Sequence, residues 1–449
     1  MAFDFRKKFI AKTTPNNVPP SPGPSQTNGW AFKKLDTPAK KVAEIYIGVD
    51  FGTTFTKVSF QVGGKEGSTK YSLRFNNDGG DEEYCIPSIL GYDAEKAQLV
   101  FTQEPEDDDL EPIRYFKYSM IQEGVPRSQQ LERGGTKNDP QRLCSAFYIA
   151  HILKMAKNGI RFHPAVKNRY DEIHWYVNMG VPVSDFNAKP KPVYDEALNV
   201  AWRLVEDPLF SDVMELLVID EIYSRWTSHE TWNDRLNTVP ELYAELIMFL
   251  QDRSVDTGFY SVIDIGGGTV DMAVFFKHID LFTQQVEISC VAQEVCPLGY
   301  EMLVRHPEKN LARKIVYRSY GEMVTKAYRE HRSDWDKVKN NSKNFVHFFM
   351  GGARTVAFYH ACVESMADVH ARGFIAYPGM VEEDMVHYMR GKSYLDVDNN
   401  SRLLISQMLA QPFEFMPPLS GQPWHFERQP LFRDAPSAMD LQLSVYGDW

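Results

Sequence analysis

The feature that most constrains the fold is the stretch 260–276, which reads YSVIDIGGGTVDMAVFF. Two short apolar runs flank three consecutive glycines, with Asp264 on one side and Asp271 on the other. Apolar runs rich in β-branched and aromatic residues, joined by a glycine turn, predict a β-hairpin. Phosphate oxygens can approach the N–H groups at such a tip because glycine has no Cβ, and a nearby carboxylate can hold a hydrated metal ion. An ordinary hairpin with a glycine-rich turn is the alternative.

A second stretch with the same pattern lies upstream. Residues 45–60 read IYIGVDFGTTFTKVSF, in which a strand, Asp50, a Gly52-Thr53-Thr54 turn and a second strand follow one another. The two threonines add hydroxyl groups beside the backbone donors. Two such hairpins indicate an internal duplication in which each half holds a phosphate chain from one side. Neither stretch contains the GxxxxGK[ST] pattern of a Walker A loop.

This pair of hairpins resembles the phosphate-1 and phosphate-2 loops of the actin-like ATPase superfamily. The wording DIGGGTVD is closest to that of the seventy-kilodalton heat-shock chaperones. The resemblance implies an α/β fold with two duplicated ribonuclease-H-like lobes and a nucleotide cleft between them. It covers about 43–411 and so corresponds to the ATPase portion, without the chaperones' peptide-binding domain.

The resemblance also implies cofactors, ATP or ADP with Mg²⁺, and roles for the residues of both loops. Asp50 and Asp264 would hold the hydrated Mg²⁺, and Asp264 would also orient or deprotonate the attacking water. Asp271 would act in the surrounding water shell. The residues expected to contact phosphates through hydroxyl or backbone N–H groups are Gly52, Thr53, Thr54, Gly266, Gly267, Gly268 and Thr269.

Two further residues match the family more loosely. Lys117 follows Ile-Arg-Tyr-Phe and is the candidate for a lysine that points at the γ-phosphate; a surface lysine on a helix is the alternative. Glu241 falls on the family's glutamate that orders metal-bound waters, within the stretch 238–251, which predicts a helix with Pro240 in its first turn. An acidic residue that favours a helix N-terminus is the alternative for Glu241.

The stretch 351–354, Gly-Gly-Ala-Arg, follows the predicted strand 344–350 and resembles the family's adenosine loop. Gly351 and Gly352 would let the backbone approach the base, and Arg354 would stack on it. Alanine replaces the family's serine and the arginine comes one position early, which weakens the preference for adenine. Other predicted elements are helices at 144–156, 191–205, 311–331 and 398–409, and strands at 173–183 and 286–292.

Composition places the chain among ordinary globular proteins, with 43% apolar and 24% charged residues. The net charge of −11 argues against a general nucleic-acid binder. No apolar run reaches the length of a membrane span and no signal-peptide pattern opens the chain, so we expect a cytoplasmic protein. The five cysteines show no CxxC spacing and are expected to be reduced core thiols (Cys85, Cys144, Cys290, Cys296 and Cys362).

The predicted organisation is a disordered leader (1–42), lobe I (43–238), lobe II with a reduced insert (239–411) and a C-terminal extension (412–449). The expected function is slow hydrolysis of Mg-ATP as a conformational switch that acts with a partner protein, away from membranes and nucleic acid. A filament-forming actin relative is the main alternative. A sugar-kinase-like enzyme and a nucleotide sensor without hydrolysis are others.

Overall fold

The computed structural model describes residues 40–65, 68–75, 81–105, 109–120, 128–182, 191–227, 233–251, 257–279, 286–296, 298–332, 345–351, 356–359, 361, 380–381, 403–413 and 416. All of these except Lys40 belong to one compact unit, 41–449. The predicted leader lies outside the described residues except for 40–42. Of the predicted C-terminal extension, only 412, 413 and 416 are described.

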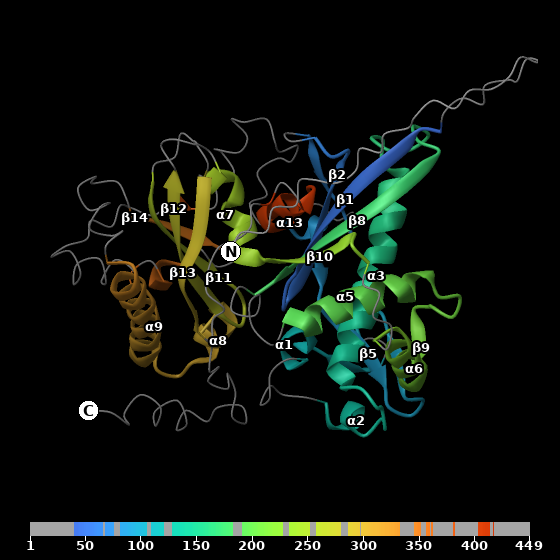
Figure 1. Ribbon diagram of the computed structural model, residues 1–449. Helices are drawn as coiled ribbons and strands as arrows, with labels where there is room; N and C mark the ends of the chain where they lie inside the picture. Colours follow the sequence, from blue (N-terminus) through green and yellow to red (C-terminus); the bar gives the residue numbers. More distant parts are fainter. Residues whose placement is uncertain are drawn as a thin grey trace, which may run out of the picture. The chain divides into compact units, whose positions relative to one another are not determined.

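The first sheet has six strands, in the order β10-β8-β1-β2-β3 with β4 also paired to β2 (Figure 1). Their bounds are β1 (Val42–Phe51), β2 (Phe55–Val62), β3 (Lys70–Ser72), β4 (Ile86–Pro87), β8 (Glu172–Val181) and β10 (Leu236–Pro240). Neighbours among β1, β2 and β3 are antiparallel, whereas β8 runs parallel to β1 and β10 parallel to β8. The parallel pairings require crossover connections, which helices provide.

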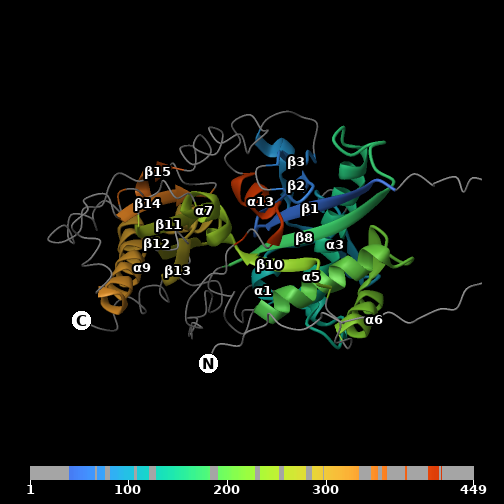
Figure 2. The same ribbon diagram turned by 45° about the horizontal axis from the view of Figure 1, so that its top comes forward.

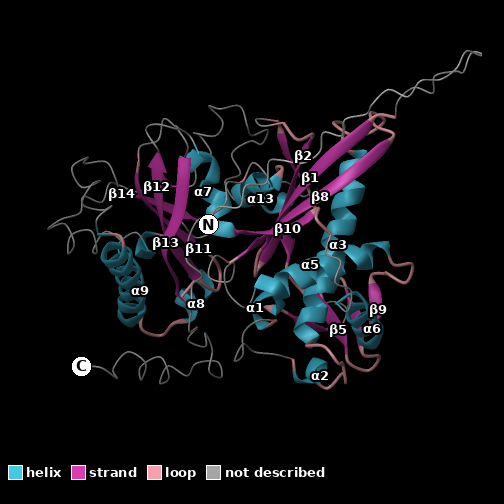
Figure 3. Ribbon diagram, viewed as in Figure 1, coloured by secondary structure: helices cyan, strands magenta, loops and turns pink. Residues whose placement is uncertain are grey.

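The second sheet has five strands in the order β13-β12-β11-β14-β15 (Figure 3). They are β11 (Gly258–Ile265), β12 (Val270–Ile279), β13 (Val286–Cys296), β14 (Phe345–Met350) and β15 (Met380–Val381). Neighbours among β11, β12 and β13 are antiparallel, β14 is parallel to β11, and β15 is parallel to β14. The second sheet therefore repeats the strand order and the strand directions of the first.

A third, smaller sheet has the order β7-β5-β6-β9. Its strands are β5 (Leu90–Asp93), β6 (Gln98–Val100), β7 (Glu111–Ile113) and β9 (Val213–Glu215), and a 3₁₀ turn, η1 (Asp81–Tyr84), precedes it. The described helices are α1 (Phe116–Ser119), α2 (Gln129–Glu132), α3 (Pro140–Phe162), α5 (Lys191–Glu206), α6 (Leu216–Thr227), α7 (Glu241–Gln251), α8 (Tyr300–Arg305), α9 (Lys309–Glu330) and α13 (Leu404–Leu409). The fold is mixed α/β, as predicted. None of these described helices combines the length and apolarity that crossing a bilayer requires.

The first sheet is covered on one face by α3 and α5 (Figure 2). Alternate residues of β1, namely Ile45, Ile47 and Val49, are buried with these helices in one hydrophobic cluster. Helix α3 begins after Asp139, whose side chain accepts a hydrogen bond from the Gln141 N–H. Such a cap satisfies an N–H group that the helix itself cannot pair.

The other face of the first sheet contacts the short helix α13. Gly48 of β1 makes this approach possible, because a Cβ there would lie 2.1 Å from the carbonyl oxygen of Ser406. The side of α13 toward the sheet is polar: the Asn178 amide donates to the Leu409 carbonyl at 2.8 Å, and the hydroxyls of Ser59 and Ser406 lie 2.8 Å apart. The contact is thus a hydrogen-bonded one with the backbones close together.

We expect Gly48→Ala to destabilise the protein by about 1–3 kcal/mol, because the added methyl group meets backbone atoms that cannot rotate away. Chemical denaturation measures this change. Gly159→Ala in α3 is the matched control, since its Cβ would make only an ordinary contact, 3.5 Å from the Leu73 side chain. Equal stabilities of the two variants would contradict the close approach of α13.

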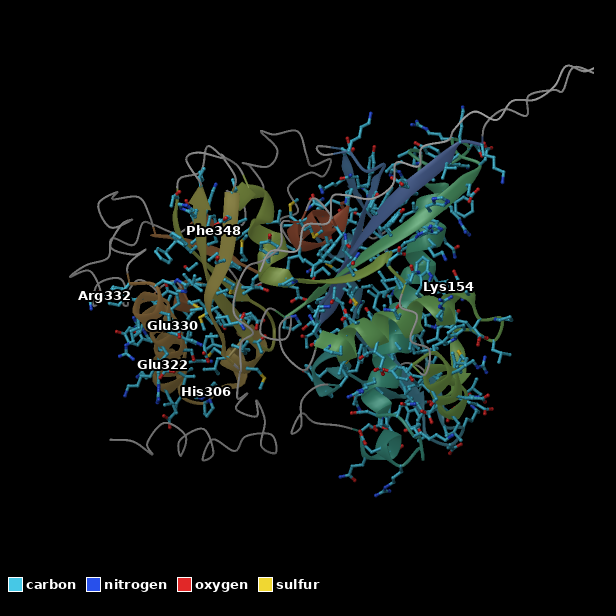
Figure 4. All side chains as sticks on the ribbon, in the orientation of Figure 1. Lys154, His306, Glu322, Glu330, Arg332 and Phe348 are labelled. Carbon is cyan, nitrogen blue, oxygen red and sulfur yellow. The ribbon has the colours of Figure 1, made fainter. Side chains whose placement is uncertain are left out.

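The second sheet buries both of its faces. Phe259 and Ile263 of β11 pack with α8 and α9, whereas Tyr260 and Val262 pack with α7 and α13. Phe348 of β14 belongs to the second of these clusters and is fully buried (Figure 4). Successive strand residues point to opposite faces, so Asp264 lies on the face that α7 covers.

The predicted hairpins and most of the other predicted elements are confirmed within the described residues. The predicted start of one helix, at residue 238, was wrong. Residues 238–240 form the end of β10, where Thr238 and Val239 pair with Met179 and Gly180 of β8. Helix α7 therefore begins at Glu241, and Pro240 ends the strand. A proline is tolerated there because a strand end does not need its N–H, and β-branched neighbours favour the strand. Of the predicted helix 398–409, only 404–409 is described as helix.

Candidate functional site

The two glycine-tipped hairpins are equivalent residue for residue. In the first, Asp50 lies opposite Lys57 across the β1–β2 ladder. In the second, Asp264 lies opposite Asp271 across the β11–β12 ladder. In both, the last paired residues enclose four loop residues, 52–55 and 266–269. Position 52 therefore corresponds to 266, and position 54 to 268.

Both first aspartates lie on the inner faces of their sheets, toward α13 and α7. Asp50 alternates with the core residues Val49 and Phe51 and so shares the α13 face with Gly48. Asp50 is 3% exposed, and its carboxylate accepts a hydrogen bond from the Lys57 ammonium at 2.6 Å. Burial of this carboxylate is thus compensated by a charge from the opposite strand.

A second ion pair joins α1 to α7. The Lys117 ammonium donates to Glu241 Oε1 at 2.6 Å, and both residues are buried. Lys117 is 3% exposed and lies 5.7 Å from the Phe51 ring centre, so the surface-lysine alternative was wrong. Glu241 is the first residue of α7, three residues after the predicted start of that helix. Gly180 of β8 leaves room for it, because a Cβ there would lie 2.8 Å from Glu241 Cγ.

The carboxylates of the two hairpins act on one another. The pKa of Asp264 is raised to about 8, mainly by burial and also by the neighbouring carboxylates of Asp271, Glu241 and Asp50, while the Lys57 ammonium lowers it. Each of these partners therefore lies within electrostatic reach of Asp264, although they come from three different parts of the chain. This part of the molecule carries more carboxylates than ammonium groups.

Asp271 and Glu241, which interact with Asp264, also hold their protons more tightly than free carboxyl groups do. The pKa of Asp271 is raised to about 7, mainly by burial and also by the charge of Glu241, while Lys117 and the Thr269 hydroxyl lower it. Burial also raises the pKa of Glu241, against the opposing attraction of Lys117. A divalent cation is the type of ligand that would relieve this excess of negative charge, and carboxylate oxygens are the donors that Mg²⁺ prefers.

The free energy of unfolding should depend on pH in a defined direction. Asp264 and Asp271 bind protons more tightly in the folded state than in the unfolded chain, where the pKa of aspartate is about 4. Without metal or nucleotide, stability should therefore fall as pH rises from about 4 to about 8, by about 1–2 kcal/mol after allowance for solvent screening at these partly exposed groups. Urea denaturation across this range measures the slope. A free energy of unfolding that stays constant or rises with pH would contradict the claim that these carboxylates are incompletely compensated. So would a slope in Asp264→Asn equal to that of the unaltered protein.

The remaining predicted residues are placed as follows. The Thr269 hydroxyl donates to the Asp271 carboxylate at 3.1 Å, so this loop residue is tied to its own hairpin. Gly351 ends β14 with φ of +83°, and a Cβ there would lie 2.2 Å from Asp264 Oδ1. Glycine is therefore required at 351 by its backbone conformation and by its contact with the carboxylate. Gly352 and Arg354 lie outside the described residues.

Lys57 interacts with Asp50 and Asp264, and the sequence analysis did not predict it as a site residue. The signal that could have found it is spacing, because Lys57 follows Asp50 by the same interval at which Asp271 follows Asp264. With the hairpins aligned, a lysine on the returning strand of the first hairpin occupies the position of an aspartate on the returning strand of the second. The two halves thus contribute opposite charges at equivalent positions.

Among the described residues, no group of three or more His, Cys, Asp and Glu side chains is arranged to ligate a metal ion directly. The Mg²⁺ implied by the resemblance would be held through water molecules, and such a site does not need a direct ligand set. A scan against protein-family models finds none that matches the chain, and a search of curated proteins finds no significant match.

Proposed function

We propose that the chain is an actin-like ATPase with two duplicated ribonuclease-H-like lobes, which binds Mg-ATP between its two glycine-tipped hairpins. The observation that carries this proposal is the equivalence of residues 50–57 and 264–271 on two sheets of the same strand order. The coupling of Asp264 to Asp50 and Glu241 supports it, because groups from both halves then share one electrostatic environment.

In the proposed reaction, phosphate oxygens are bound by backbone N–H groups of the loops 52–55 and 266–269. Asp50 and Asp264 would hold the hydrated Mg²⁺, which would supply charge neutralisation for the phosphate chain. Asp264 orients or deprotonates the attacking water, a task that favours a carboxyl group with a pKa near the working pH, and burial raises the pKa of Asp264 to about 8. Phosphoryl transfer depends mainly on positioning and electrostatics, so no covalent intermediate is required.

We further propose that hydrolysis is slow and serves a conformational switch that acts with a partner protein. Helix α13 supports this part of the proposal, because it contacts β1, β2 and β8 of the first sheet as well as α7, which packs on the second. Its apolar residues Leu404 and Met408 belong to the cluster of the second sheet, while its polar side meets the first. A change in the separation of the hairpins would therefore act on this helix.

The test is release of phosphate from ATP with purified protein and Mg²⁺, combined with sedimentation in ATP and in ADP. We expect slow turnover that requires Mg²⁺, with the protein remaining in the supernatant. Pelleting that depends on ATP and on protein concentration would favour a filament-forming actin relative. Transfer of phosphate to an added sugar instead of water would favour a kinase. Nucleotide binding with no turnover would favour a sensor.

A further inference from the structure

Ser88, which lies outside the first loop, hydrogen-bonds to two of its carbonyl groups. The N–H of Ser88 donates to the carbonyl oxygen of Thr54 at 2.9 Å, and the Ser88 hydroxyl donates to the carbonyl oxygen of Gly52 at 2.7 Å. Ser88 follows β4, is 5% exposed, and lies 32 residues away from Thr56, whose hydroxyl oxygen is 3.0 Å from its own. The contact with Thr56 is buried, and the hydrogen bond to the Gly52 carbonyl is partly buried.

At the second loop, the described hydrogen bonds to the two equivalent carbonyl groups come from backbone N–H groups. The N–H of Gly299 donates to the carbonyl oxygen of Gly268 at 3.1 Å, and the N–H of Tyr300 donates to that of Gly266 at 2.9 Å. Gly299 must be glycine for this contact, because a Cβ there would lie 2.5 Å from the nitrogen of Thr269.

Positions 52 and 54 correspond to 266 and 268, so both loops are restrained at the same two carbonyl groups. The restraints consist of three backbone N–H groups and one side chain, the hydroxyl of Ser88. In effect, this hydroxyl does in the first loop what the N–H of Tyr300 does in the second.

The direction of the carbonyl groups sets the direction of the amide hydrogens. A trans peptide unit is planar, with its C=O and N–H pointing in opposite directions. When the carbonyl groups of Gly52 and Thr54 point at Ser88, the N–H groups of Thr53 and Phe55 point away from it. Backbone N–H groups of a loop that point to the same side can together bind an anion.

We propose that Ser88 is a positioning residue for the phosphate site, whose hydroxyl holds the Gly52 carbonyl and thereby turns the N–H groups of the first loop toward the phosphates. This inference rests on the proposed function for the identity of the ligand. The role of Ser88 in shaping the loop does not depend on which ligand binds there.

The test compares Ser88→Ala and Ser88→Thr with the unaltered protein in two measurements. Hydrogen exchange without nucleotide should be about 10-fold faster in Ser88→Ala for the segment 86–90, whose Ser88 amide is bonded to the loop, and unchanged for 298–303 at the second loop. Calorimetric titration with Mg-ATP should give about 10-fold weaker binding in Ser88→Ala, the factor that one buried hydrogen bond contributes. Ser88→Thr retains the hydroxyl and should restore both values.

Ser224→Ala is the control, because it removes a serine hydroxyl of α6 that accepts a hydrogen bond from the Asn138 amide at 2.8 Å and does not bond the loop. It should leave Mg-ATP affinity and exchange at 86–90 unchanged. Unchanged exchange and affinity in Ser88→Ala, or a loss in Ser88→Thr as large as in Ser88→Ala, would overturn the inference. If the unaltered protein bound no Mg-ATP, the proposed function would fail, and exchange alone would still decide whether Ser88 shapes the loop.

Discussion

Asp264→Asn should reduce ATP turnover by about 10²–10⁴-fold, the range over which a positioned general base contributes to catalysis. The amide of asparagine keeps the size of the side chain beside Gly351 but cannot accept a proton from water. Binding of Mg-ATP should change far less than turnover. Single-turnover measurement of phosphate release separates the chemical step from binding and product release.

The same substitution should not destabilise the protein at neutral pH without ligands. Burial and neighbouring carboxylates oppose the charge of Asp264, so an uncharged replacement removes an unfavourable interaction. Asp93→Asn is the control, because Asp93 forms an ion pair with Lys96 in the third sheet. Turnover in Asp264→Asn equal to that of the Asp93→Asn control would remove Asp264 from the reaction.

Gly268→Val should weaken the binding of Mg-ATP by about 100-fold or more, which corresponds to about 2.8 kcal/mol. A Cβ at Gly268 would meet no atom of the described residues within 4 Å apart from its immediate chain neighbours, so the described part of the protein can accommodate a side chain there. The added carbons would instead occupy the space beside the loop in which the proposal places the phosphates. Gly268→Ala should show a smaller loss, since its side chain is shorter.

Calorimetric titration with Mg-ATP checks this prediction, and thermal unfolding without ligand verifies that the variants fold. Gly159→Ala, on the exposed side of α3, is the control for exchanging a glycine elsewhere. Affinity unchanged in Gly268→Val, with the fold intact, would show that phosphates do not approach this loop.

The hairpins could be predicted because their information is local. Apolar runs around Gly52 and Gly266 specify strand, turn and strand without help from the rest of the chain. The aspartates before each turn could be predicted for the same reason, since alternation along a strand determines the face on which they lie. Each hairpin forms two neighbouring strands of a sheet, and the two sheets have the same strand order.

Other features depend on contacts between distant segments and could not be predicted from a single sequence. Thr238 and Val239 become strand because β8 offers them a parallel edge, which outweighs the helical pattern that follows. Ser88 reaches Gly52 across an interval of 36 residues. Helix α13, which we had assigned to the second half, also contacts the first sheet through Gly48, far away along the chain.

The most direct test of the central claim is calorimetric titration of the purified protein with ATP and with ADP, each in the presence of Mg²⁺. We expect saturable binding of both nucleotides at a single site on each chain, weakened when Mg²⁺ is removed. Absence of binding for both nucleotides, with protein whose fold is verified by its thermal unfolding, would contradict the claim that the two glycine-tipped hairpins form a nucleotide site.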